Sequence, residues 1–587
     1  MCARFSRTRL VLATAMAMTT GAAFVTAAPV VRAVAIVTTV VLSVTFLVVA
    51  RLHGRTLDSL KRMRVWAQLR KDRGSRLERA WDALPPAFPL SPPEGHPFGA
   101  DLQIVGPRSI HHLVNTAATK TGGRRLAEWL LSEQPTNGEI VRRKSLVSAL
   151  MKRSLFRDRL SLSGRDHLSM VDLSPLAAWL ARSSSADLRR GLAQVASLSG
   201  LTYLLLALWI GGLVPLVWPL SLALYFAVYL LRAREISGLS DRADGLVSAL
   251  DALSAMFGFV ESRPQSGSPA LSQLCAPFWE SETRPSSLLR TARRVAGAAT
   301  YQRSGLLWVL LNTLGPWDLY FAYRLERLRE TLSKIAPLWL DAWATLEAAA
   351  SLAQFADLEG RPLATEAMPG VAVFEAENLV HPLLPVTEAV PNSIRFAAVG
   401  EAFIVTGSNM AGKSTFLRAI GANLVLAQAG GPVTASSLTA VPFRVFAVLN
   451  VADSVQDGFS YFYAEVRRLK ALLDAVEGPG PPVFFLIDEI LRGTNNRERF
   501  HGSGAFVQAL AQSGSAVGLL STHDLDLAQL DADGFSNVHF RDRIEGGRMV
   551  FDYELREGPS ETTNALRVLE AAGLPTDLDR NISGLTP

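Results

Sequence analysis

The run from Gly191 to Leu231 contains no charged residue. It is about twice as long as the roughly 20 apolar residues with which one helix crosses a bilayer core. The stretch "GGLVPLVWP", residues 211–219, places glycine and proline in its middle, where a turn belongs. The run therefore predicts a helical hairpin, residues 191–232, that crosses a membrane twice. The alternative is one long buried core helix followed by a strand.

Two further apolar runs lie near the N-terminus. Leu10 to Ala28 is uncharged, and Ala33 to Ala50 is uncharged and rich in valine, isoleucine and leucine. Each could cross a bilayer once, so residues 1–55 are predicted to form a transmembrane hairpin. The alternative is a secretory signal peptide, because "RFSRTR", an apolar stretch and "TAAPV" follow one another in that order.

Basic residues exceed acidic ones by 59 − 53 = 6. Cytoplasmic ends of membrane spans attract such residues, which predicts a multi-pass protein of the inner (cytoplasmic) membrane; binding to DNA is the alternative explanation. Two cysteines provide no disulfide framework and fit a reducing cytoplasm. The basic residues that flank the apolar runs are Arg4, Arg7, Arg9, Arg51, Arg55, Lys61, Arg62, Arg64, Arg189, Arg190, Arg232 and Arg234.

The composition and the spacing of apolar residues change along the rest of the chain. Residues 56–99 combine a basic, helix-prone stretch with the Pro-rich linker "LPPAFPLSPPEGHPFG", which stops helices. Residues 100–190 and 233–370 show apolar residues at helical spacing and form the predicted helical core or lever region. From residue 371 to 587, short apolar runs alternate with Gly-rich turns and helices, which is typical of an α/β domain.

The stretch "GSNMAGKS" follows the predicted strand "AFIV" and fits the phosphate-loop pattern G-x-x-x-x-G-K-[ST]. Glycines let backbone N–H groups surround phosphate oxygens, and the helix predicted from Thr415 onward adds positive potential. Lys413 is expected to reach the β- and γ-phosphates, and the Ser414 hydroxyl is expected to bind Mg²⁺. The predicted ATP-binding residues in this loop are Gly407, Ser408, Asn409, Met410, Ala411, Gly412, Lys413, Ser414 and Thr415.

Two more strands are predicted to end in functional side chains. "PPVFFLIDEI" reads as a buried strand followed by Asp488, expected to hold Mg²⁺ directly or through water, and Glu489, expected to orient or deprotonate the attacking water. "SAVGLLSTHD" reads as a third strand that ends at His523, expected to sense the γ-phosphate. For each strand end, the alternative is an ordinary polar surface residue.

Together these motifs resemble the MutS family of mismatch-repair ATPases, which belong to the ABC-type ATPases. The family's T-G-P-N-M-G-G-K-S-T, D-E-I-G-R-G-T and G-x-S-T-F-M-x-E-M correspond to "TGSNMAGKST", "DEILRGT" and "GFSYFYAEV" here. "HPLLP" and "VPN" precede the loop like family segments that approach the nucleotide, which implies that Asn392 contacts ATP. The resemblance is strong from about Val371 to Pro575 and weaker over Asp101 to Leu160.

The whole chain is predicted to have a multi-domain fold. The apolar runs predict N-terminal and internal transmembrane helical hairpins, and the helical spacing predicts an α-helical core or lever region. The resemblance implies a C-terminal α/β P-loop (ABC-type) ATPase domain. It implies a homodimer in which Ser460 reaches the γ-phosphate bound by the other subunit; an ordinary helix N-cap is the alternative for Ser460. ATP binding would close the dimer and move the levers.

DNA is the partner that the family implies, although membrane spans stand where the family has its mismatch-reading and clamp parts. Two other classes stay open: an ATP-switched membrane scaffold without DNA binding, and a transporter-like ATPase. The predicted spans carry no charged residue that would mark a substrate path.

Overall fold

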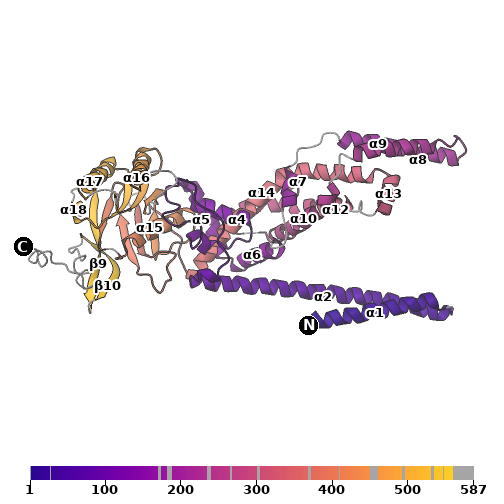
Figure 1. Ribbon diagram of the computed structural model, residues 1–587, viewed down its shortest axis with the longest axis horizontal. Helices are drawn as coiled ribbons and strands as arrows, with labels where there is room; N and C mark the ends of the chain where they lie inside the picture. Colours follow the sequence, from indigo (N-terminus) through magenta and orange to yellow (C-terminus); the bar gives the residue numbers. More distant parts are fainter. Residues whose placement is uncertain are drawn as a thin grey trace, which may run out of the picture. The chain divides into compact units, whose positions relative to one another are not determined.

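The computed structural model of the chain contains two compact units, Met1–Gly74 and Ser75–Pro587 (Figure 1). Each unit is treated by itself below. The described residues are 2–26, 28–168, 174–181, 188–233, 239–264, 267–299, 305–367, 372–408, 410–449, 461–491, 496–529, 534–545 and 548–559.

The first unit is a hairpin of α1 (Cys2–Val25) and α2 (Pro29–Leu77). The Thr39 hydroxyl donates to Thr19 Oγ1 at 2.9 Å, which joins the two helices in their apolar halves. Both helices are long and apolar enough to cross a membrane. Because α2 continues without a break through residues 55 and 56, one helix carries both the predicted span and the predicted basic segment.

The second unit begins with helices, and the Pro-rich residues 84–99 form neither helix nor strand, as predicted. Thr119 and Thr136 cap the starts of α4 and α5 by accepting backbone N–H groups, while Gly360 ends α14 with φ 63°. The helices are η1 (Trp81–Ala83), α3 (Ile110–Val114), α4 (Lys120–Leu130), α5 (Asn137–Met151), α6 (Ser154–Leu168), α7 (Ser174–Leu180), α8 (Leu188–Ile210), α9 (Trp218–Ala233), α10 (Leu239–Glu261), α11 (Pro269–Trp279), α12 (Pro285–Ala299), α13 (Gly305–Leu314) and α14 (Trp317–Glu359).

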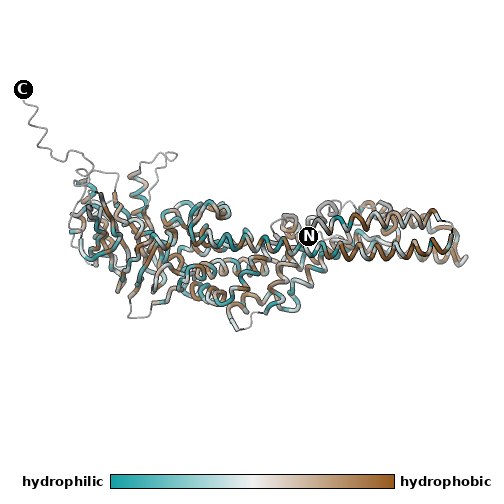
Figure 2. The backbone as a smooth tube through the Cα atoms, turned by 90° about the horizontal axis from the view of Figure 1, so that it is seen from below, coloured by the Kyte–Doolittle hydropathy of each residue, from teal (hydrophilic) through white to brown (hydrophobic). Residues whose placement is uncertain are grey.

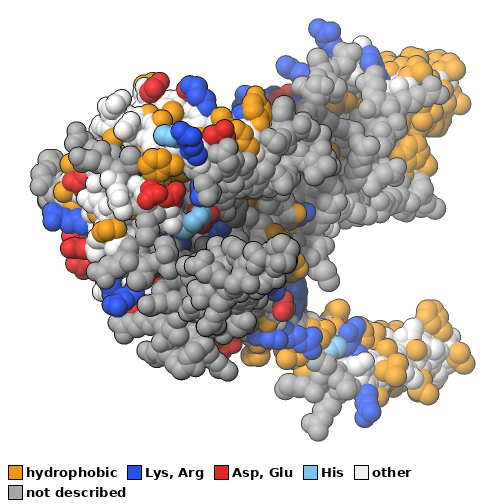
Figure 3. Space-filling model, turned by 60° about the vertical axis from the view of Figure 1, so that its left-hand side comes forward, with side chains coloured by type: hydrophobic (Ala, Val, Ile, Leu, Met, Phe, Trp, Pro, Cys, Tyr) orange, Lys and Arg blue, Asp and Glu red, His pale blue; other side chains and the backbone are white. Residues whose placement is uncertain are grey.

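Helices α8 and α9 form the second hairpin, with the turn at residues 211–217. The predicted pair of helices around a Gly/Pro turn is therefore confirmed, and the alternative of one helix followed by a strand is wrong. α8 is long and apolar enough to cross a membrane, and α9 is a shorter apolar helix. Brown, which marks hydrophobic residues in Figure 2, is most continuous along the helical hairpins and alternates with teal in the rest of the chain. Orange side chains cover the part of α8–α9 at the upper right of Figure 3.

The C-terminal part is a mixed α/β region with two sheets. The larger sheet has the order β10-β9-β4-β8-β7-β6, in which only β10 is antiparallel to its neighbour. The smaller sheet has the order β1-β5-β2-β3. The strands are β1 (Thr365–Glu366), β2 (Phe374–Leu379), β3 (Asn392–Phe396), β4 (Ala402–Thr406), β5 (Ser437–Ala440), β6 (Arg444–Val448), β7 (Val483–Asp488), β8 (Ala516–Ser521), β9 (Phe535–Glu545) and β10 (Arg548–Glu557).

The three predicted strands are confirmed as β4, β7 and β8, which lie side by side in the larger sheet. Every residue of β7 and β8 is buried, as expected for parallel strands covered on both faces. The helices of this region are α15 (Lys413–Gln428), α16 (Tyr461–Glu477), α17 (Asn496–Ser513) and α18 (Leu525–Ala528). α15 begins at Lys413, two residues earlier than predicted.

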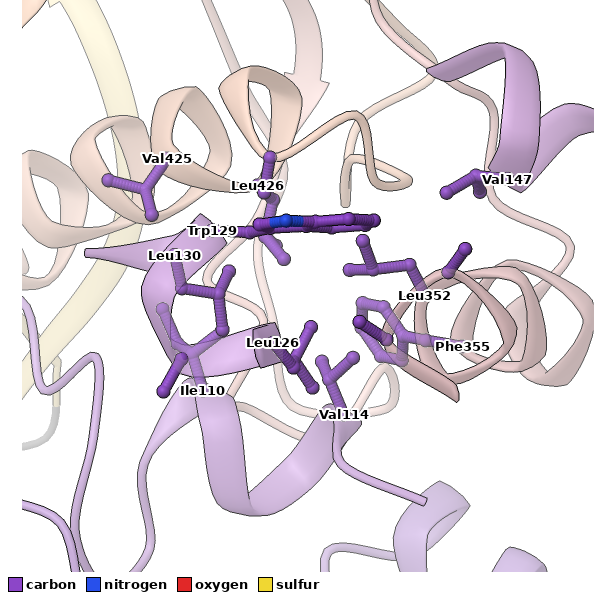
Figure 4. Close-up of a cluster of buried hydrophobic side chains, with 14 of the residues drawn as sticks. Ile110, Val114, Leu126, Trp129, Leu130, Val147, Leu352, Phe355, Val425 and Leu426 are labelled. Atoms are coloured by element: carbon purple, nitrogen blue, oxygen red, sulfur yellow. The ribbon is translucent and has the colours of Figure 1, made fainter. Parts of the chain in front are cut away.

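One apolar cluster joins the α/β region to the helices before it (Figure 4). Val425 and Leu426 of α15 share this cluster with Trp129 of α4 and with Leu352 of α14. At Gly431, just beyond α15, a Cβ atom would lie 2.7 Å from the Leu352 side chain, so only glycine fits there without a shift. The helix that follows the phosphate-loop motif is therefore packed directly on the helical region.

Candidate functional site: the loop between β4 and α15

The loop between β4 and α15 depends on two glycines in backbone conformations that other residues rarely adopt. Gly407 has φ 141° and Gly412 has φ 103°. A Cβ atom at position 407 would lie 2.8 Å from the backbone oxygen of Phe540 in β9. Gly412 is the N-cap of α15 and supplies no side-chain cap. A helix start without a side-chain cap suits an anion, because its backbone N–H groups point outward along the helix axis.

The first two side chains of α15 turn toward the loop and toward β7. Lys413 is buried, and its Nζ donates to the backbone oxygens of Gly407 at 2.6 Å and Ser408 at 2.9 Å. The Ser414 hydroxyl donates to Asp488 Oδ2 at 2.5 Å. A cation and a hydroxyl thus follow one another at the start of α15.

Asp488 ends β7, where the carboxyl ends of parallel strands meet at one edge of the sheet. It stands in register with Ser521 of β8, whose hydroxyl donates to Asp488 Oδ1. With Ser414 on the other oxygen, both carboxylate oxygens accept a hydroxyl. The charge of a side chain that is only 8% exposed is therefore stabilised.

Glu489 follows in a left-handed conformation, with φ 57°. Its N–H donates to the Ser521 oxygen at 3.0 Å, and its Oε1 lies 3.3 Å from Nδ1 of His523, which is about half exposed. A non-glycine residue in this conformation costs on the order of 1 kcal/mol or more and persists only where its surroundings enforce it. The surroundings, including the backbone bond to Ser521, thus hold Glu489 in this conformation directly after the end of β7.

A cavity of about 750 Å³ opens beside these groups. Ser408, Lys413 and Ser414 line it from the loop and α15, and Asp488 and Glu489 line it from the end of β7.

The segment between β2 and β3 forms another wall of the cavity and includes His381. Burial, with a smaller effect from Arg418, lowers the pKa of His381 to about 4. The imidazole is therefore neutral at neutral pH.

Asn392 also borders the cavity, but its side-chain amide already binds backbone groups. Its Nδ2 donates to the Tyr553 oxygen at 2.9 Å, and its Oδ1 accepts the Leu555 N–H at 2.7 Å. These bonds span the irregular register of β10 between residues 551 and 555. Asn392 therefore fixes β10 against β3 at the rim of the cavity.

The other predicted residues differ in how they meet the cavity. Met410, Gly412 and Thr415 line it, whereas Ala411 is buried in the apolar core beneath the loop. Asn409 and Ser460 lie outside the described residues.

Sequence reasoning missed Ser521, His381 and Tyr553. Ser521 stands two residues before His523 at a predicted strand end, so strand pairing could have found it. His381 lies in "HPLLP", a stretch that the resemblance had pointed to without assigning the residue a role. Tyr553 begins "YELREGP", a stretch near the C-terminus that also resembles the family but that gave this residue no role; the folded β10 brings it to the cavity.

The fold and the site define a class: a largely helical protein that ends in a mixed α/β domain, with a phosphate-loop sequence at the carboxyl end of a parallel strand. Comparison with known proteins narrows this class. Residues 403–583, which include the phosphate-loop sequence, match the family MutS domain V, so this C-terminal part of the chain is similar to MutS proteins.

The chain is similar to curated proteins called DNA mismatch repair protein MutS. It is 33% identical to the one from Natronomonas pharaonis over 201 residues, which is 33% of this chain and 23% of that protein. It is 31% identical to the one from Lactobacillus helveticus over 199 residues, again 33% of this chain and 23% of the relative. The matched region thus spans about a quarter of the length of these relatives.

Proposed function

We propose that the α/β domain binds ATP with Mg²⁺ and hydrolyses it, and that both helical hairpins hold the protein in the inner (cytoplasmic) membrane with this domain in the cytoplasm. The observation that carries the proposal is the meeting of Lys413, Ser414, Asp488 and Glu489 at one cavity. The match to MutS domain V and the similarity to MutS proteins support the same activity.

The cavity suits a nucleotide triphosphate in size and in chemistry. Its volume of about 750 Å³ lies within the usual range for small-molecule sites. Ser408 Oγ is buried and has no hydrogen-bond partner among the described residues, so it has a donor to offer a phosphate oxygen. Lys413 is bound to neutral backbone oxygens, and a charged phosphate oxygen is a stronger acceptor than either of them.

Ser414 and Asp488 are the residues that would hold Mg²⁺. A hydroxyl and a carboxylate are oxygen ligands of the kind this ion prefers, and their hydrogen bond already holds them side by side. The described residues contain no cluster of three or more His, Cys, Asp or Glu side chains fit for a metal ion. This suits Mg²⁺, which is usually held by one or two carboxylates together with substrate phosphates. When bound, it would neutralise charge on the phosphate oxygens.

Glu489 is the proposed general base and His523 the proposed γ-phosphate sensor. The Glu489 carboxylate lines the cavity and contacts His523 at 3.3 Å. A base in this role must lie within hydrogen-bond reach of the water that it activates. The backbone bond from Glu489 to Ser521 fixes the position from which the carboxylate would act.

The hairpins supply the proposed anchor. Among the described residues, three helices are long and apolar enough to cross a membrane, and α9 is a shorter apolar helix. Arg189 and Arg190 at the start of α8 and Arg232 at the end of α9 put positive charge at one end of the second hairpin. That end would face the cytoplasm by the positive-inside tendency.

A homodimer through the ATPase domains, with ATP-driven closure and lever movement, is proposed from the MutS resemblance. In such a dimer Ser460 would meet the nucleotide of the partner copy. Met410, in the loop at the cavity, is 84% exposed. A long apolar side chain beside the site suits a surface that a second copy covers.

DNA is the proposed substrate of the motor, as in mismatch repair, because the matched relatives are named for that process. The proposal is tested by ATP turnover of the detergent-solubilised protein, with Glu489→Gln as the inactive variant. Turnover should be measured with and without duplex DNA, matched and mismatched, at two salt concentrations.

Three results separate the possibilities. Stimulation that fades as salt rises is expected of a DNA-driven enzyme, since phosphate contacts depend on salt. Turnover indifferent to DNA would contradict that partner and leave an ATP-switched membrane scaffold. Turnover unchanged in Glu489→Gln would contradict the assigned base.

A further inference from the structure

Helix α13 (Gly305–Leu314) is apolar but too short to cross a membrane. Its ten residues extend about 15 Å, half of the roughly 30 Å of a bilayer core. Val309, Leu310 and Leu314 are 51%, 54% and 63% exposed. Gly315 and Pro316 then reverse the chain into α14. The described residues place nothing over these three side chains that would keep them from solvent.

The end of α13 is capped by the second hairpin. The Tyr225 hydroxyl of α9 donates to the Asn312 backbone oxygen at 2.5 Å, and the Tyr203 hydroxyl of α8 donates to the Thr313 backbone oxygen at 2.7 Å. The Gly315 N–H donates to the Leu311 oxygen. Three of the four terminal carbonyl groups, which water would satisfy at an ordinary helix end, thus have protein partners.

The turn after α13 contains an acid that is also enclosed. Asp318 is 4% exposed, and its Oδ2 accepts Tyr229 Oη at 2.7 Å and Trp308 Nε1 at 2.8 Å. Its N–H donates to Asn312 Oδ1 at 3.3 Å. Irregular backbone and ionisable side chains are tolerated at membrane depth only when they are enclosed by protein in this way.

We propose that α13 and the first turns of α14 form a re-entrant membrane segment, docked on α8–α9, whose exposed face contacts lipid acyl chains. This inference rests on the membrane anchor proposed above for α8–α9. It adds a third membrane element that is neither a span nor part of the soluble lever region.

Two observations favour lipid over a protein partner as the occupant of this face. The hairpin on which α13 packs exposes its own apolar side chains, among them Leu204 and Leu224, so the apolar surface continues from one element to the next. Exposed Arg324 and Arg327 follow Tyr320, which is 44% exposed, by one to two turns of α14. Aromatic and then basic residues in this order suit the cytoplasmic headgroup layer.

The test places a fluorescent label at single cysteines in the full-length protein, reconstituted in vesicles with and without lipids brominated along their acyl chains. Cys2→Ser removes one native thiol, while Cys275 is fully buried and stays. Leu310→Cys is the probe, Leu224→Cys on α9 reports the anchor, and exposed Lys334→Cys on α14 is the aqueous control. The protein without an introduced cysteine gives the labelling background, and ATP turnover checks the fold.

Quenching of Leu310→Cys by brominated lipid should come within about twofold of Leu224→Cys and exceed Lys334→Cys about fivefold, because α13 would lie inside the bilayer core. Quenching of Leu224→Cys alone, with Leu310→Cys reached by aqueous iodide, would overturn the re-entrant segment and leave the anchor intact. Quenching of neither would overturn both. Leu314→Cys is the second probe if Leu310→Cys does not fold.

Discussion

The α/β domain and the α13–α14 turn each bury an aspartate, but the two acids face different surroundings. Asp488 accepts one hydroxyl on each oxygen and borders a cavity of about 750 Å³. Asp318 accepts two donors on Oδ2, while its buried Oδ1 has no hydrogen-bond partner among the described residues.

The difference distinguishes an acid that can take part in chemistry from one that holds helices together. A carboxylate that borders a cavity can exchange its hydroxyl partners for a ligand or a cation at little cost. An enclosed carboxylate has no such exchange and instead fixes the elements that donate to it, here α9 and α13. Although both aspartates are buried, a substitution at Asp488 is therefore expected to affect chemistry, whereas one at Asp318 is expected to affect how the helices are held together.

The largest expected effect is on ATP turnover. Asp488→Asn should lower phosphate release at saturating ATP by roughly 100-fold or more, because the proposed Mg²⁺ ligand would lose its charge. Asp318→Asn is the matched control, since it makes the same change at the enclosed acid; its turnover should stay within about twofold of the wild-type protein. An equal loss of turnover in both variants would contradict the different roles assigned to Asp488 and Asp318.

A third buried acid extends the comparison to the helical region. Glu347 of α14 is enclosed, and it accepts the Thr119 hydroxyl and the Ala118 N–H at the start of α4. At Gly122 a Cβ atom would lie 2.2 Å from its carboxylate. Burial raises the pKa of Glu347 to about 7.

Since the folded protein holds this proton more tightly than the unfolded chain, the contribution to stability is full below pH 4.5 and is lost as the pH rises through about 7. The loss should amount to ~3 kcal/mol. The free energy of unfolding of the wild-type protein minus that of Glu347→Gln, measured from pH 4 to 8, should fall across this window. A difference that does not change with pH would refute the assigned protonation.

A smaller effect is expected when the carboxylate of the enclosed Asp318, which accepts two hydrogen bonds, is removed. Asp318→Ala should reduce the free energy of unfolding in detergent by on the order of 2 kcal/mol, because Tyr229 and Trp308 keep buried donors without a partner. Thermal unfolding measures the loss. Asp251→Ala, at a half-exposed acid of α10 with an ion pair to Arg293, should change it little.

The smallest effect belongs to the hydroxyl at the edge of the second hairpin. Tyr203 is 41% exposed, so Tyr203→Phe should cost about 0.5 kcal/mol, whereas the buried Tyr225→Phe should cost about 1.5 kcal/mol. The ranking of the two unfolding midpoints is the measurement. A larger loss at Tyr203 would place the main contact of α13 on α8 instead of α9.

Local patterns predicted the site better than they predicted its surroundings. Glycine spacing and unbroken apolar runs located β4, β7 and β8, and with them Lys413, Ser414 and Asp488. The start of α15 was missed by two residues because Gly412 caps the helix through its own backbone conformation. The bridging role of Asn392 depends on an irregular register in β10, which no local pattern encodes.

The contact between α13 and the second hairpin could not be predicted from the sequence, because the residues that form it lie far apart in the chain. Tyr225 and Asn312 are 87 residues apart, and Tyr229 and Asp318 are 89 apart. The sequence marked the second hairpin by its lack of charge, but that same lack conceals which face of the hairpin binds another helix. The apolar character of α13 alone also fits an ordinary core helix.

The cluster drawn in Figure 4 bears on how this protein can be handled in the laboratory. A recombinant fragment that starts at β2 would keep the whole phosphate-loop motif yet strip Trp129 and Leu352 from the apolar flank of α15. The uncovered surface would favour aggregation, and poor solubility of such a piece would say nothing about its catalytic competence. A shortened version intended for enzymology should therefore begin no later than Ser75, at the boundary between the two compact units.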